Sequence, residues 1–210
     1  MPELELWHEA SRFRFRPEKA AEAIDFIARA QPGLTQYFVG KVLYLADKEH
    51  FLDWGRPITF DRYVAMVHGP VPSAVRNMLA AAAGVEAGMD EERFALALEN
   101  AELLHKRVRV ELEVRLGGER QRVFPHDTRQ PFEHLSRSDQ EALAHAVRVG
   151  GQMSFGALRE ETHKDEAWRT AWYGREANRK VANIDIALWA APQDRDAARE
   201  HLRRYVAVGR

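Results

Sequence analysis

The feature that most constrains this chain is a run from Thr35 to Trp54 whose apolar residues cover most of the circumference of a helix. These residues are too closely spaced to share one stripe: Phe38, Val39, Val42, Leu43, Tyr44, Leu45 and Ala46. A helix that is apolar on nearly every side is stable only when other elements surround it. The pattern therefore predicts a buried central helix over residues 35–54. Gly40, which costs about 1 kcal/mol relative to alanine inside a helix, indicates that another backbone approaches closely there.

The residues before this run predict a strand and a surface helix. In the segment Arg12–Arg16, RFRFR, arginine and phenylalanine alternate with the period of a half-buried strand. Pro17 suits the first turn of a helix, and apolar residues at helical spacing continue to Ala30. We expect a strand at 12–16 and then a helix with one buried face.

The segment after the central helix predicts two shorter helices separated by a corner. Thr59 is a candidate N-cap for a helix over residues 60–67, because its hydroxyl oxygen can accept a hydrogen bond from the first turn. The sequence His68-Gly69-Pro70 ends that helix, since proline has no N–H to continue it. A second helix is expected over residues 72–83, begun by Pro72. Residues 89–104 fit either a helix or a strand, and we favour the helix.

Residues 106–124 predict a β-hairpin. Valine and leucine alternate with charged residues from Val108 to Leu116, Gly117-Gly118 provides a two-residue turn, and Arg120 to Phe124 returns. An isolated hairpin is only marginally stable, so we expect the strand at 12–16 to pair with it.

The last third of the chain is predicted to be helical. Ser138 and Glu141 have the spacing of a capping box, which would begin a helix that ends at Gly150-Gly151. A turn of helix is expected after Ser154. Further helices are expected over residues 165–174, 178–190 and 194–207.

Together these elements predict a mainly α protein with a small antiparallel β element (α+β). A chain of 210 residues is long enough for one well-buried core. We therefore expect a single globular helical domain around the central helix at 35–54, with the β-hairpin at 107–124. Residues 1–16 would form an N-terminal strand or extension, residues 17–172 the main domain, and residues 173–210 a helical extension packed on the same domain.

Composition argues against several classes of protein. With no cysteine, the chain has no disulfides or thiolate zinc sites, which suits the cytoplasm, where we expect it. No window approaches the roughly 18 apolar residues of a membrane span, and the acidic N-terminus does not resemble a secretory signal. Lysine plus arginine (31) nearly cancel aspartate plus glutamate (32), so the net charge of -1 gives no global attraction for nucleic acid. We therefore expect neither a membrane nor nucleic acid as the partner.

The sequence contains no recognisable pattern of catalytic or metal-ligating residues. Its nine histidines have no metal-ligand spacing, and it lacks nucleotide-binding glycine loops and a Gly-x-Ser-x-Gly elbow. We therefore predict a protein without a cofactor, a metal or enzymatic activity. An enzyme would need His68, Asp47 or His163 to converge in one pocket. The alternative is that His68 bonds local backbone and that Asp47 caps a helix or pairs with a nearby charge.

Basic residues form three groups that could contact phosphates. Acidic residues are interspersed in the second and third groups, which favours solvated faces, and no basic recognition helix is evident. A DNA-binding autoregulator or a phage-associated regulatory protein stays an alternative reading. The three groups are Arg12, Arg14 and Arg16; Lys106, Arg107 and Arg109; and Arg199, Arg203 and Arg204.

Four short segments together carry a family fingerprint. They are KVLYLAD from Lys41, GRPITFDRYVA from Gly55, HGPVPSAV from His68 and LREETHKDEAW from Leu158. Their order and spacing resemble the Panacea (SocA-like) antitoxin domains, over about residues 17–172. We expect the positions that carry the resemblance to form scaffold: Lys41, Leu43, Tyr44, Asp47, Pro57, His68, Gly69, Pro70, Val71 and Trp168.

The resemblance implies an antitoxin of a bacterial or phage toxin–antitoxin pair, which neutralises its toxin by direct protein contact. It also raises a second mechanism, in which the antitoxin is a proteolytic adaptor that delivers the toxin to ClpXP. Sequestration without proteolysis is at least as well supported by these residues. We expect partner contacts around the 68–70 corner, the hairpin and the two terminal extensions, residues 1–16 and 175–210. The candidate residues are Arg56, Arg62, Tyr63, His68, Arg76, Arg107 and Arg109.

Overall fold

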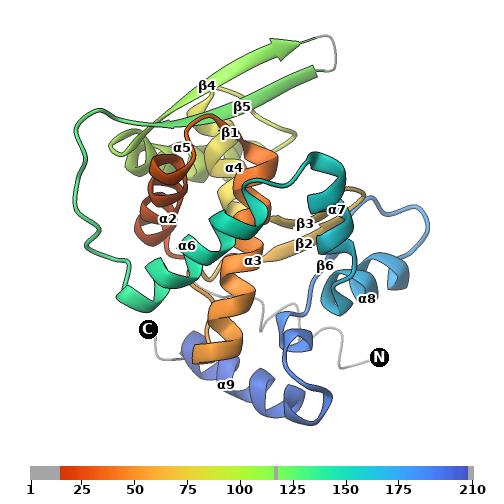
Figure 1. The fold of residues 1–210 in the computed structure, drawn as a ribbon. Coiled ribbons are helices and arrows are strands. Elements are labelled where there is room, and N and C mark those ends of the chain that lie inside the picture. Colours follow the sequence, from red (N-terminus) through yellow and green to blue (C-terminus); the bar gives the residue numbers. More distant parts are fainter. Residues whose placement is uncertain (1–14, 116–117, 208–210) are drawn as a thin grey trace.

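The protein is mainly helical with small antiparallel sheets, as its sequence predicts (Figure 1). The structure, a computed structural model, describes residues 15–115 and 118–207. Within these ranges, no helix combines the length and the apolar character needed to cross a lipid bilayer.

Helix α3 (Gln36–Trp54) runs through the middle of the molecule, which confirms the predicted central helix (Figure 1). Helices α2 (Pro17–Ala30) and α6 (Arg137–Gly150) pack along it. The close approach predicted at Gly40 is also present, because a Cβ atom there would lie 3.2 Å from Cδ of Pro72. The all-round apolar pattern of α3 is therefore explained by contacts on several sides.

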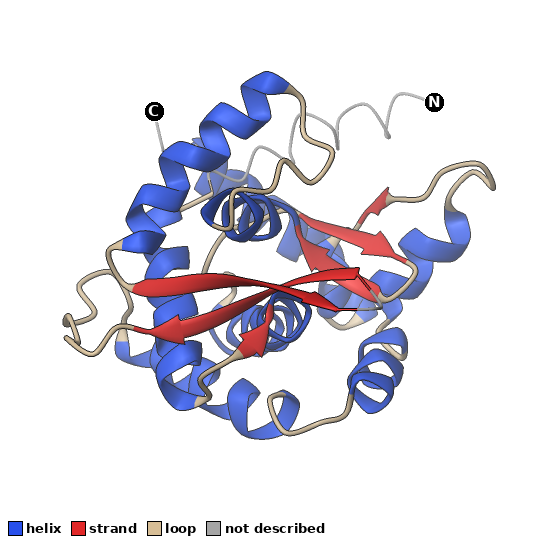
Figure 2. Cartoon of the chain, turned by 90° about the horizontal axis from the view of Figure 1, so that it is seen from above, coloured by secondary structure: helices blue, strands red, loops and turns tan. Residues whose placement is uncertain are grey.

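The first sheet has the strand order β1-β5-β4 and contains the predicted hairpin. Strand β4 (Val108–Arg115) pairs with β5 (Gly118–Pro125), and Val110 lies opposite Val123. The third strand is β1 (Leu34–Thr35), which adds to β5 directly before α3 begins. Figure 2 shows both sheets, in red, among the helices.

The strand predicted at 12–16 falls mostly outside the described residues, which begin at Phe15. Phe15 packs against the main core, and the backbone N–H of Arg16 donates to the carbonyl of Thr59. Neither residue belongs to a strand. Among the described residues, the strand that adds to the hairpin is β1.

The helix predicted over residues 60–67 is wrong, because this segment forms strand β2 (Tyr63–Met66). Thr59 does not cap a helix: its hydroxyl donates to Asp47, and Phe60 takes a positive φ of 55°. Strand β3 (Gly69–Pro72) returns antiparallel to β2, and β6 (Ala182–Asn183) completes the order β3-β2-β6. The 68–70 corner is thus the turn of a hairpin and not the end of a helix.

Helices α4 (Ser73–Ala82) and α5 (Glu91–His105) pack on each other, which confirms the helix over 72–83 and the helical reading of 89–104. The capping box expected at Ser138 is wrong by two residues. Ser136 is the N-cap of α6: its hydroxyl accepts from the N–H of Asp139, and the Asp139 carboxylate accepts from the N–H of Ser136.

The C-terminal third contains α7 (Phe155–His163), α8 (Glu166–Gly174) and α9 (Arg195–Ala207), close to the predicted bounds. The helix predicted over residues 178–190 is wrong. Only Ala182 and Asn183 within this segment form a strand, β6, which pairs with β2. The 3₁₀ turn η1 (Ile186–Trp189) follows, with a second such turn at η2 (Pro192–Asp194).

The buried apolar residues form two clusters. The larger lies among α2 to α6 and the first sheet. The smaller is aromatic, with the ring of Tyr44 5.1 Å from Tyr63 and 5.4 Å from Trp189, and it also contains Trp168. Trp189 comes from the segment predicted as a C-terminal extension, so that segment shares this core with α3.

Candidate functional site

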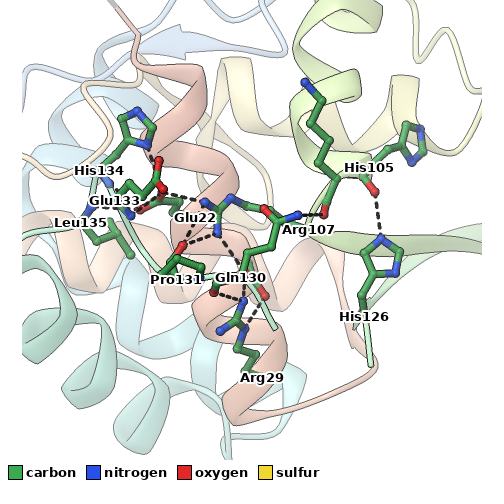
Figure 3. A network of polar contacts seen from close by, with 12 residues as sticks. Glu22, Arg29, His105, Arg107, His126, Gln130, Pro131, Glu133, His134 and Leu135 are labelled. Atoms are coloured by element: carbon green, nitrogen blue, oxygen red, sulfur yellow. Dashed lines mark hydrogen bonds and ion pairs between the residues drawn. The ribbon is translucent and has the colours of Figure 1, made fainter. Parts of the chain in front are cut away.

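Most buried charges of this protein are neutralised by other groups of the chain, and Glu22 is the clearest case (Figure 3). Its carboxylate accepts from the backbone N–H groups of Glu133, His134 and Leu135 and lies 2.8 Å from Nη2 of Arg107. These contacts join α2 to the segment before α6. Arg107, a predicted partner contact, is therefore used inside the protein, with its side chain only 11% exposed.

Asp139 is the centre of a second internal network. Its carboxylate lies 2.7 Å from Nζ of Lys19, 3.3 Å from Nη1 of Arg56 and 3.1 Å from Nε2 of His50. Hydrogen bonds from Lys19 and Ser136 lower the pKa of Asp139 against the opposing effect of burial. Arg56, another predicted partner contact, thus helps to hold α3 against α6.

Asp47 holds the chain that follows α3. Its carboxylate accepts from the N–H of Ile58, from the N–H and hydroxyl of Thr59, and from the Tyr63 hydroxyl at 2.8 Å. Burial raises the pKa of Asp47, and these hydrogen bonds oppose the rise. Tyr63 is 1% exposed, which places this predicted partner contact in the interior.

Several other fingerprint positions also lie in the interior. Leu43 is in the main cluster, and Tyr44 and Trp168 are in the aromatic cluster. Pro57 is buried beside the Asp47 network, whereas Val71 is only partly buried. These positions stabilise the scaffold through packing.

Lys41 is as deeply buried as the charges above, with 1% of its surface exposed. It differs from them in its partners, because no acidic side chain among the described residues pairs with it. Its Nζ donates one hydrogen bond, to the carbonyl of Pro70 at 2.6 Å, and lies 5.2 Å from the centre of the Tyr37 ring. Burial lowers the pKa of Lys41 to about 7. A lysine in this state is half protonated near neutral pH.

Gly69 lets the hairpin turn approach Lys41. It has a φ of +102°, and a Cβ atom there would lie 2.6 Å from Nζ of Lys41, 2.8 Å from Oγ1 of Thr162 and 3.3 Å from Cδ2 of His163. Any side chain at this position would collide with those groups. The fingerprint glycine therefore allows α3, the hairpin and α7 to bring three polar groups around one point.

Two polar atoms close to Lys41 have no hydrogen-bond partner within the described residues: Oη of Tyr37 and Nε2 of His163. Burial raises the pKa of Tyr37 to about 12. Burial, and then the positive charges of Arg159, Lys41 and His68, lower the pKa of His163 to about 4. The imidazole is therefore neutral at physiological pH, and it stacks on Trp168 at 3.7 Å. Buried polar atoms without partners are rare and frequently mark functional sites.

A cavity of about 200 Å³ opens beside these groups, between the start of α3, the β2–β3 hairpin and one face of α4. Most of its wall is apolar, with Tyr37 and Lys41 on the α3 side and Arg76 on the α4 side. Val67 on its wall is 51% exposed, and Phe155, which stacks 4.5 Å from Tyr37, is 46% exposed. We call this cavity, together with Tyr37, Lys41, Thr162 and His163 around Gly69, the Lys41 pocket.

The remaining predicted partner contacts are divided between the pocket and other surfaces. His68 is exposed on the pocket wall, 5.5 Å from the Phe155 ring, and Arg76 lines the cavity while donating to the carbonyl of Ala87. Arg62, directly before β2, is exposed and lies outside the pocket lining. Arg109 lies on the hairpin and pairs with Glu111.

The sequence reasoning did not propose Tyr37, Thr162 or Arg159. One signal was available, since Lys41 is a charged residue in the middle of a run predicted to be buried on every side. Of the three residues considered for an enzyme, His68 and His163 lie on the same side of the molecule, and Asp47 is separate from them. Asp47 is enclosed with Thr59 and Tyr63, whereas His68 and His163 lie near Lys41.

Of the basic groups considered for phosphate contacts, Arg12 and Arg14 lie outside the described residues, and the arginines of the second and third groups are paired with acids. Arg199 contacts Asp185 at 3.0 Å and Asp196 at 2.7 Å, and Arg203 contacts Glu200 at 3.4 Å. In the part of the chain that the structure describes, no three histidine or acidic side chains are placed to hold a metal ion.

Comparison with known proteins gives one match. A family model described as "Antitoxin SocA-like, Panacea domain" matches residues 39–169, which include most of α3, the β2–β3 hairpin, α4 and α7. No curated protein and no solved structure matches the chain. The matched range therefore contains Lys41, Gly69, Thr162 and His163, and Tyr37 lies just before it.

Proposed function

This chain belongs to the SocA-like antitoxin family with the Panacea domain, and from that premise we propose that it neutralises a toxin protein by binding it directly. The observation that carries the proposal is the family match over residues 39–169, which takes in nearly all of the Lys41 pocket. Binding requires a rigid scaffold and an open surface patch, and the pocket lies between elements that internal charge networks hold in place.

Co-expression with the product of the adjacent reading frame tests this function. The neighbouring protein alone should stop growth of the host, and this protein should restore it. Arg137→Ala, at a position whose side chain is 93% exposed on α6, is a control that should restore growth equally. A neighbour that is harmless alone, or equally toxic with and without this protein, would contradict the proposal.

We further propose that sequestration is sufficient for neutralisation, and that delivery to ClpXP is a second mechanism to be tested beside it. Both would act in the cytoplasm, which the cysteine-free composition suits. A degradation assay with purified ClpXP separates them. Faster loss of toxin when this protein is added supports delivery, and an unchanged rate leaves sequestration as the mechanism.

A further inference from the structure

The Lys41 ammonium lacks the partner that a buried charge normally has. An ammonium has three N–H donors, and only one of them is used, on the carbonyl of Pro70. The buried acids in the described ranges are all satisfied: Asp61, for example, accepts from the N–H groups of Ala74 and Val75. Asp47 and Asp61 are also buried without a cation, but neutral donors satisfy their oxygens. A buried ammonium with two unused donors is costly, so its persistence points to an acceptor that arrives from outside.

The permanent charges close to Lys41 are arginines: Arg76 approaches from α4 and Arg159 from α7. Two histidines, His68 on the hairpin and His163 on α7, also lie close to it. Among the described residues, no aspartate or glutamate lines the cavity. Asp165, at the start of α8, is already paired with Lys48 at 2.6 Å. A low-dielectric cleft bounded by charges of one sign attracts the opposite sign, which here is an anion.

The size and lining of the cavity indicate a protein side chain as its occupant. Small-molecule sites usually enclose about 300–1,000 Å³, whereas this cavity of about 200 Å³ is smaller and open to solvent. The exposed apolar side chains of Val67 and Phe155 beside it suit contact with a flat protein surface. Protein interfaces commonly place a few anchoring side chains in such pockets.

We propose that the Lys41 pocket receives an acidic side chain of the toxin, flanked by an apolar residue, and that the carboxylate accepts hydrogen bonds from Nζ of Lys41. Tyr37 lines the same cavity, and its hydroxyl, which is buried without a partner among the described residues, is a second donor once its side chain turns toward the carboxylate. The apolar neighbour lies against Val67 and Phe155. This inference rests on the proposed function and specifies which surface and which chemistry recognise the toxin.

The affinity of the purified pair tests this inference. Lys41→Met should weaken toxin binding by about 100-fold or more, because the carboxylate loses the buried ammonium that donates hydrogen bonds to it. Tyr37→Phe, which removes only an unbonded hydroxyl, should weaken it by about 5- to 10-fold and keeps the test available if Lys41→Met does not fold. Lys48→Met, two turns further along α3, is the matched control and should stay within about 3-fold of the wild type. A folded Lys41→Met protein that also stays within about 3-fold would overturn the inference.

A double-mutant cycle identifies the acid. Each aspartate and glutamate of the toxin is changed to its amide and combined with Lys41→Met. One toxin acid should lose its effect on affinity once Lys41 is methionine. If every acid variant weakens binding to the wild type and to Lys41→Met by the same factor, the pocket does not hold a carboxylate.

A peptide probe separates failure of this inference from failure of the proposed function. If the neighbouring protein is not a toxin that this chain neutralises, the pocket can still be titrated with acetyl-Leu-Glu-Leu-amide and acetyl-Leu-Gln-Leu-amide. The glutamate peptide should bind about 10-fold more tightly, and it should shift the NMR signals of Tyr37 and Lys41. Equal binding of the two peptides, or no binding of either, would overturn the inference independently of the toxin.

Discussion

Lys19 and Lys41 are two buried lysines on neighbouring helices with opposite surroundings. Lys19, on α2, is 7% exposed and lies 2.7 Å from the carboxylate of Asp139. Lys41, on α3, is 1% exposed and has only a backbone carbonyl. Burial lowers the pKa of both, but for Lys19 the hydrogen bond and charge of Asp139 oppose the shift. The difference separates charges that hold the scaffold together from one whose counter-ion comes from another protein.

The largest effect on stability should come from Glu22, the most highly coordinated of the internally partnered charges. Glu22→Leu leaves three backbone N–H groups without their acceptor and removes the nearer of the two acids that pair with Arg107, so it should lower the free energy of unfolding by about 4 kcal/mol. Urea unfolding followed by circular dichroism measures this.

Glu18, an exposed acid one turn earlier on α2, provides the control. Glu18→Leu should change the free energy of unfolding by less than about 0.5 kcal/mol. If the Glu22 variant were as stable as the Glu18 variant, the network in Figure 3 would not stabilise the fold.

The second largest loss of stability is expected from a substitution of Lys19. Lys19→Met leaves Asp139 with one fewer cation in a buried site, so we expect a loss of about 3 kcal/mol. Urea unfolding at pH 7 gives the value. A variant as stable as the wild type would remove the distinction between the two lysines.

The same substitution at Lys41 should raise the free energy of unfolding, whereas at Lys19 it lowers it. A pKa of about 7 in the folded state, against about 10.4 for an unperturbed lysine, destabilises the fold by about 4 kcal/mol at pH 7. Losing the hydrogen bond to Pro70 offsets about 1 to 2 kcal/mol of the gain from Lys41→Met. The variant should therefore be more stable by about 2 kcal/mol at pH 7.

The pH dependence checks the sign of this effect. Between about pH 7 and 10.4 the unfolded wild type binds more protons at Lys41 than the folded protein does, so wild-type stability should rise with pH in that window. Lys41→Met should lack this rise. A variant that is less stable than the wild type at pH 7 would mean that Lys41 has a structural role.

The smallest effect on stability is expected from a substitution of His163, whose Nε2 has no hydrogen-bond partner within the described residues. Its folded pKa of about 4 lies below the usual 6.5, so stability is lost as the pH falls from about 6.5 toward 4, where the unfolded chain binds the proton more readily. His163→Phe keeps a ring that can stack on Trp168 and should reduce this loss by about 1 kcal/mol at pH 5. Identical acid sensitivity of the two proteins in thermal melts would contradict this.

The parts of the fold that could be predicted from sequence depend on local patterns. Helix α3 followed from its apolar density and the β4–β5 hairpin from its alternation. Strand β2 could not be predicted from local pattern. The hydroxyl of Thr59 donates a hydrogen bond to Asp47, so Thr59 does not act as the N-cap that a helix over residues 60–67 would need. The helix predicted over residues 178–190 was wrong for a similar reason, since strand β6 in this segment forms by pairing with β2, which is distant in the sequence.

The fingerprint identified the residues of the scaffold but did not separate the pocket from the core. Lys41 and Asp47 are six residues apart and both buried, yet one lacks a charged partner and the other accepts four hydrogen bonds. That difference depends on α7, whose His163 and Arg159 lie more than a hundred residues further along the chain. Spacing within a short motif carries no information about such contacts.

The most direct test of the account is the pKa of the Lys41 ammonium, measured by NMR with ¹⁵N-labelled lysine in the free protein and in its complex with the toxin. We expect a pKa of about 7 in the free protein and a value that returns toward about 10.4 in the complex, because a carboxylate beside the ammonium favours its charged form. A pKa near 10.4 in the free protein, or one that does not change in the complex, would contradict the claim that Lys41 binds an acidic side chain of its partner.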